Sequence, residues 1–81
     1  MDPAPPDART TALALLSARA TGATVCPSEV ARALARGNWR AEMPDVHAAV
    51  DQLLAEGRIT LSWKGQRLVT RAGPYRIARP A

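Results

Sequence analysis

The chain has 81 residues and a formal net charge of +4, and 22% of its residues are charged against 47% hydrophobic ones. This length fits one small domain, and the composition is that of a folded chain. A single cysteine excludes an intrachain disulfide and a zinc site built from thiolates. The longest apolar runs have about five residues, well short of the roughly 20 that span a bilayer. We therefore expect a cytoplasmic protein with no membrane contact and no cofactor.

The N-terminal end divides into a leader and the start of the folded domain. Residues 1–6 contain three prolines, which cannot enter a helix interior, so we expect a flexible leader there. Residues 7–79 are predicted to form a single domain. Asp7 is a good N-cap for a first helix that runs to about Arg19.

Residues 23–37 change from a strand-like sequence pattern to a helical one. Thr24 and Val25 are β-branched and predict a short strand. Pro27 suits the first position of a second helix, which Gly37 is expected to end. The stretch "GNWRAEM", residues 37–43, is predicted to be a turn.

A third helix is predicted to begin at Pro44 and to end at Gly57. After it, "RITLSW" alternates apolar and polar residues, which predicts a strand with one face made of Ile59, Leu61 and Trp63. The run "PYRIA" predicts a last strand with Tyr75 and Ile77 on one face. Residues 64–74 between these strands are expected to be a basic loop.

The predicted order of elements is that of an α+β fold, the winged helix-turn-helix. Its wing would be the C-terminal β-hairpin made of these last two strands and the basic loop between them. The segments "ATVCPSEVARAL", "WRAEMPDVHAAVDQLLAEGRI" and "KGQ…GPYRIAR" resemble a small bacterial winged-helix family that carries a domain-of-unknown-function label. "CPSEVAR" and "W-R-x-x-M-P" are the most specific parts of the resemblance. It covers about residues 12–79 and implies the fold, but no activity.

The charge is unevenly distributed along the chain. Residues 1–56 hold five Arg against seven acids, whereas residues 57–81 hold five Arg and one Lys with no acid. An acid-free basic segment is typical of a surface that neutralises phosphates. A hairpin kept soluble by its charges is the alternative. The expected nucleic-acid contacts are, on the second helix and the turn after it, Arg32, Arg36 and Arg40, and on the wing, Lys64, Arg67 and Arg71.

The third helix carries Asp45 and Asp51 on its outward face and is therefore a poor reader of DNA bases. Gln52 could bond an adenine, so it completes the set of candidate contacts. We expect binding of nucleic acid led by the wing, from a monomer or a weak dimer. The alternative is a protein-interaction module in which the acidic third helix docks on a basic partner.

The tryptophans, the cysteine and the histidine are expected to have mainly structural roles. Trp39 and Trp63 are expected to close the small core, with base stacking as the alternative. Cys26 precedes a helix, which leaves a thiol sensor open as a third reading, and His47 lies within reach of Asp51 for an ion pair. One His and one Cys without a ligand cluster, a phosphate loop or paired carboxylates predict that the protein is not an enzyme.

Overall fold

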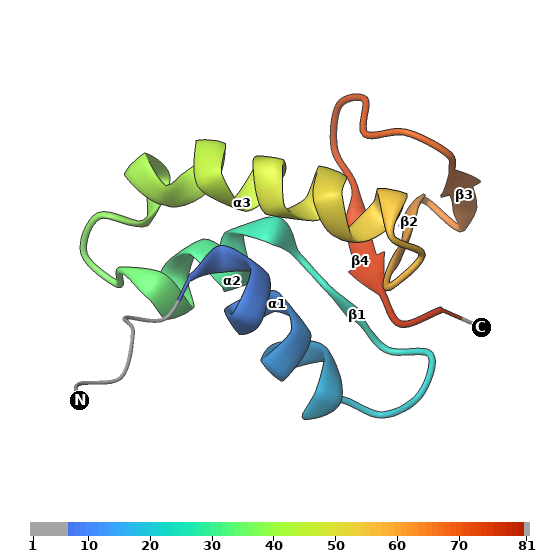
Figure 1. The fold of residues 1–81 in the computed structure, drawn as a ribbon, viewed down its shortest axis with the longest axis horizontal. Helices are drawn as coiled ribbons and strands as arrows, with labels where there is room; N and C mark the ends of the chain where they lie inside the picture. The colour runs from blue at the N-terminus through green and yellow to red at the C-terminus, as the bar shows by residue number, and fades with distance from the viewer. Residues whose placement is uncertain (1–6, 81) are drawn as a thin grey trace.

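The computed structural model describes residues 7–80, so the predicted leader over residues 1–6 lies outside the described part of the chain. Three helices lie against a four-stranded antiparallel sheet (Figure 1), which confirms the α+β class. In chain order the elements are α1 (Ala8–Ser17), β1 (Thr24–Val25), α2 (Pro27–Leu34), α3 (Trp39–Ala55), β2 (Thr60–Trp63), β3 (Gln66–Leu68) and β4 (Arg76–Ala78).

The first two helices begin where their capping residues predict. The Asp7 side chain accepts a hydrogen bond of 2.7 Å from the Thr10 backbone N–H, which confirms the predicted start of α1. Pro27 is the first residue of α2, as expected. The end of α2 was predicted too late, because the backbone is already extended at Ala35 and Gly37 lies in the following turn.

The predicted start of α3 is wrong. The helix begins at Trp39, and Pro44 lies inside it, so most of the segment predicted as a turn is helical. The side chains of Trp39 and Met43 pack against the core, which favours the additional helical turn. Pro44 lacks the N–H that would bond the Arg40 carbonyl, but both residues are exposed and water can reach that carbonyl.

The sheet has the strand order β1-β4-β2-β3. The prediction of a loop over residues 64–74 missed β3, which pairs with β2 across a two-residue turn. Both turn residues, Lys64 (φ 51°) and Gly65 (φ 80°), have left-handed backbone, as this hairpin turn requires. The structure thus has a strand in the first half of the predicted loop.

The core lies between the helices and one face of the sheet. The inward side chains of the three central strand positions, Val25, Leu61 and Ile77, share one cross-strand row and are almost fully buried. Tyr75, predicted to share a face with Ile77, is also buried. Trp63 is 37% exposed, which corrects its predicted place in the core. It pairs with Gln66 directly beside the exposed turn, so it lies at the turn end of the β2–β3 hairpin.

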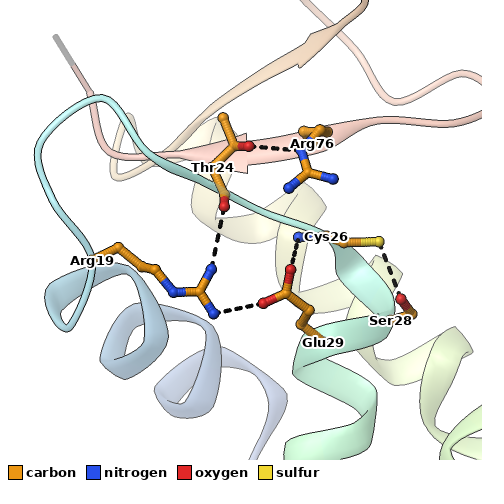
Figure 2. Close-up of polar contacts among 6 residues, drawn as sticks. All are labelled: Arg19, Thr24, Cys26, Ser28, Glu29 and Arg76. Carbon is orange, nitrogen blue, oxygen red and sulfur yellow. Dashed lines mark hydrogen bonds and ion pairs between the residues drawn. The ribbon is translucent and has the colours of Figure 1, made fainter.

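A polar network joins α1, α2, β1 and β4 (Figure 2). Arg19 pairs with Glu29 at 2.6 Å and donates to the Thr24 carbonyl at 3.4 Å. Arg76 donates to the Thr24 hydroxyl at 2.6 Å. The Arg19 guanidinium lowers the pKa of Glu29, whose carboxylate also accepts from the Cys26 backbone N–H at the start of α2. Glu29 therefore pairs with Arg19, not with Arg32 on its own helix.

Candidate nucleic-acid interface

Most basic side chains have no acidic partner among residues 7–80. Three ion pairs are formed within residues 7–80, namely Arg9–Glu56, Arg19–Glu29 and Arg71–Asp51. Eight of the eleven Lys and Arg side chains are left without a carboxylate within 4.0 Å in this part of the chain. The unpaired charge is therefore mostly positive.

Two of these unpaired arginines share one aromatic ring. The guanidinium carbons of Arg32 and Arg40 lie 4.6 Å and 4.4 Å from the centroid of the Trp39 ring. The two contacts are cation–π interactions, which restrict both side chains. Trp39 is half-buried against the core, so its predicted packing role is combined with this second one. We name these three residues the arginine–tryptophan cluster.

The arginine–tryptophan cluster lies at the N-terminus of α3. Asn38, the N-cap residue, makes no side-chain capping bond, so free N–H groups of the first turn remain available to another acceptor. The positive end of the helix dipole adds to the two guanidinium charges. Arg36 is exposed in the connection between α2 and α3. Glu42 is the acidic residue of the same first turn, but the three arginines outnumber it, so this end of the molecule carries net positive charge.

The basic residues of the wing lie at the other end of the molecule. Lys64 is in the exposed β2–β3 turn and Arg67 is an exposed residue of β3. Figure 1 shows the α2–α3 connection and β3 at opposite ends of the long axis, along which the molecule extends 41 Å. The predicted contact residues thus form two separate groups and do not converge on one patch.

Arg71, the third basic wing residue predicted to contact nucleic acid, is bound to α3. Its guanidinium contacts both carboxylate oxygens of Asp51 at 3.1 Å, and this pair lowers the pKa of Asp51. On the same face of α3, His47 Nδ1 lies 2.7 Å from the Tyr75 hydroxyl. The predicted His47–Asp51 pair is therefore replaced by two contacts between α3 and the segment that precedes β4.

Burial affects both members of the His47–Tyr75 contact. Burial lowers the pKa of His47, and the nearby positive charge of Arg71 lowers it further. Burial also raises the pKa of Tyr75 to about 12. At neutral pH the contact therefore joins a neutral imidazole to a neutral phenol.

The candidate base reader Gln52 faces a groove between α3 and the start of α1. This acidic groove, a cavity of about 390 Å³, is also lined by Asp7, Glu42 and Asp45. These are the three carboxylates of residues 7–80 that form no ion pair. Arg9 lines the groove too, but it is bound to Glu56. Gln52 thus lies among unpaired negative charges.

The last feature of the surface concerns side chains that could bind a metal ion or react as a nucleophile. Cys26 is half-buried, with its Sγ 3.1 Å from the Ser28 hydroxyl (Figure 2). Within residues 7–80 no three His, Cys, Asp or Glu side chains come together in a way that could hold a metal ion. No helix of the same segment has the length and apolar character needed to cross a membrane.

Sequence reasoning missed the contact between Arg32 and Trp39. The two residues are separated by seven positions that include the end of one helix and the start of the next. Their contact depends on the path of residues 35–38, which no local pattern determines. The only available signal was the direct neighbourhood of Trp39 and Arg40 in the sequence.

The protein is a small α+β domain whose unpaired carboxylates, within residues 7–80, lie together in the acidic groove. The family model described as "Protein of unknown function (DUF3253)" matches residues 5–80, and the chain therefore belongs to this family. The resemblance to a family with a domain-of-unknown-function label is thereby confirmed. A comparison with curated proteins finds no match.

Proposed function

We propose that this protein is a non-enzymatic winged-helix domain that binds duplex DNA through phosphate contacts. The order of elements supports this proposal, because α2 and α3 would form the helix-turn-helix and the β2–β4 hairpin the wing. β3 would widen the wing beyond a simple loop.

The arginine–tryptophan cluster is the observation that carries the proposal. It supplies two guanidinium groups, both restricted by one ring, at the positive end of the helix that would approach the major groove. Neither guanidinium has an acidic partner within the described residues. Phosphate oxygens are the acceptors that such groups bind best.

The second group of contacts would come from Lys64 and Arg67 on the wing. The repulsion expected from Asp51 is reduced, because Arg71 neutralises its carboxylate. The outward residues of α3 include Ala41, Pro44 and Ala48, which are small and offer few hydrogen bonds to bases. Binding is therefore expected to depend on the DNA backbone and only weakly on sequence.

The test is a salt titration of binding to a random-sequence duplex, measured by fluorescence anisotropy. The wild-type protein should bind in about 50 mM salt and lose most of its affinity by about 200 mM. Arg32→Gln and Arg40→Gln should each lower the slope of log K against log salt by about one, because one phosphate contact is lost. Lys64→Glu with Arg67→Glu should weaken binding further.

Arg58→Gln is the matched control, since it removes the same charge outside both groups of contacts. An unchanged slope in this variant would assign the effect to the named positions and not to net charge. No binding by the wild-type protein at about 50 mM salt, or equal losses in all three Gln variants, would overturn the proposal.

A second candidate function rests on the acidic groove. Its three unpaired carboxylates could receive a basic segment of a partner protein, as the interaction-module alternative requires. Capture of a defined protein partner should then be lost in Asp45→Arg and should survive nuclease treatment. The Asp51→Arg variant is the control, because Asp51 is already paired with Arg71.

A further inference from the structure

A second hollow of the surface has the opposite charge to the acidic groove. This basic hollow has a volume of about 410 Å³ and lies between the turn that precedes β1, the β2–β3 hairpin and the C-terminal end of the described chain. Its lining includes the polar side chains of Thr21, Thr60, Ser62, Arg67 and Arg79. We propose that the basic hollow is a binding site for a phosphate group, held by Arg67 and Arg79.

Arg79 is fixed in place by the protein itself. Its Nη2 donates to the Arg19 carbonyl at 2.7 Å and to the Thr21 hydroxyl at 3.4 Å. Both acceptors are neutral, so they orient the guanidinium without cancelling its charge. The Nε and Nη1 donors make no hydrogen bond within residues 7–80 and remain available to a ligand.

Arg67 reaches the basic hollow from the opposite strand. It pairs in register with Ser62, and paired residues of an antiparallel ladder point to the same face of the sheet. Arg67 forms no ion pair and no side-chain hydrogen bond within the described chain. The Ser62 and Thr60 hydroxyls add neutral donors beside it.

Within residues 7–80, the lining of the basic hollow contains positive charge and no Asp or Glu side chain. A smaller hollow of about 250 Å³ shares Arg79 and Pro80 with the basic hollow and is lined on its far side by Arg58. Among residues 7–80, no Asp or Glu lines either hollow. Arg58 does not line the basic hollow itself, so we assign the site to Arg67 and Arg79.

The chemistry of the lining selects the ligand. Two guanidinium groups with several hydroxyls around them match the oxygens of a phosphate, which can accept several hydrogen bonds at once. A volume of about 410 Å³ also has room for the sugar or base attached to such a group, because small-ligand sites start at about 300 Å³. A mononucleotide and a phosphate of a nucleic-acid strand share this chemistry.

Amide chemical shifts of the ¹⁵N-labelled full chain provide the test. Inorganic phosphate, adenosine monophosphate and a short single-stranded oligonucleotide are titrated in separate arms. At least one of these probes should shift the amides of Gly22, Ser62 and Gly65 with a common saturating curve. Arg67→Gln and Arg79→Gln should each weaken that binding about tenfold, the effect expected from one lost charged hydrogen bond.

Arg58→Gln is the matched control, because Arg58 is exposed, carries the same charge and lies outside the lining of the basic hollow. Saturation with the monophosphate identifies a small-molecule site, and saturation with the oligonucleotide alone identifies nucleic acid as the source of the phosphate. Both results support the site. No shift of these amides with any probe, or shifts that persist unchanged in both variants, would overturn it.

This inference goes beyond the proposed function and can fail separately from it. Loss of the arginine–tryptophan cluster by Arg32→Gln and Arg40→Gln should leave phosphate binding in the basic hollow unchanged. Conversely, Arg79→Gln should leave the contribution of α3 to duplex binding intact. A spectrum with unchanged peak dispersion in each variant shows that the fold is retained.

Discussion

The acidic groove and the basic hollow have similar volumes, about 390 Å³ and 410 Å³, but opposite charge. Every carboxylate of residues 7–80 that forms no ion pair lines the groove, and none lines the hollow. Net charge is therefore a poor description of this molecule. Within residues 7–80 the fold gathers the unpaired carboxylates at the groove and keeps them out of the hollow, so two different partners can be sought on one small domain.

The largest loss of stability should follow from a substitution in the hydrophobic core. Ile77 is fully buried and pairs with both Val25 and Leu61. Ile77→Ala should lower the free energy of unfolding by about 3 kcal/mol, because it removes buried methyl groups and leaves a cavity. Urea unfolding followed by circular dichroism measures the change. A loss under about 1 kcal/mol would contradict the described packing.

A smaller effect is expected from the network at the start of α2. Glu29→Gln removes the ion pair with Arg19 and should cost about 1 kcal/mol at pH 7, a value reduced for partial exposure to water. The folded-state pKa of Glu29 is lowered, so its stabilisation is complete above the unfolded value near 4.5 and is lost as the pH falls.

The pH dependence of Glu29→Gln provides its control. Wild type and variant should differ at pH 7 and differ less near pH 3, because the stabilisation is lost as the lowered pKa of the Glu29 carboxyl is approached. Urea unfolding at both values measures this. A difference that is the same at both pH values would show that the lost charge is not the cause.

A third prediction tests whether the position of a carboxylate on α3, and not only its charge, affects DNA binding. Asp51→Asn should release Arg71 from its ion pair and give the α3 surface one more free cation. Duplex affinity should rise severalfold and the salt slope should increase by about one. Asp45→Asn makes the same charge change inside the acidic groove and should leave the slope nearly unchanged. Equal gains in both variants would mean that only net charge matters.

The smallest expected change in stability comes from the titration of His47. Its pKa should lie below 6.5, and Arg71→Gln should raise it, because a repelling charge is removed and Asp51 is left free to attract the imidazolium. The neutral form is favoured in the folded state, so stability should increase by tenths of a kcal/mol as the pH rises towards 6.5. A ring-proton NMR titration measures both values. A wild-type value at or above 6.5 would contradict the description of this contact.

The sequence predicted elements with local signals and missed those that depend on distant contacts. The start of α1 was predictable because Asp7 bonds Thr10 only three residues away. The start of α3 was not, since the rule for Pro44 is local, whereas Trp39 and Met43 gain burial from the assembled core. The fold-back at Lys64 and Gly65 falls within the predicted loop, but the tight turn that starts β3 was not predicted, because Lys is uncommon in left-handed backbone.

The same distinction applies to the site. The basic residues of the C-terminal third were visible as an acid-free run, but their partners were not. Arg71 contacts a residue 20 positions away, and Arg79 contacts one 60 positions away. Only the fold could reveal that one is neutralised while the other keeps its charge in a hollow.

The length of α3 has a consequence for the size of any bound surface. Its 17 residues correspond to about 25 Å along the helix axis, and this rigid length separates the arginine–tryptophan cluster from the sheet end of the molecule. Because Arg71 and Tyr75 attach the segment before β4 to the same helix, the wing keeps its distance from that cluster. Family members with one helical turn more or less in α3 would present their two basic ends about 5.4 Å farther apart or closer together.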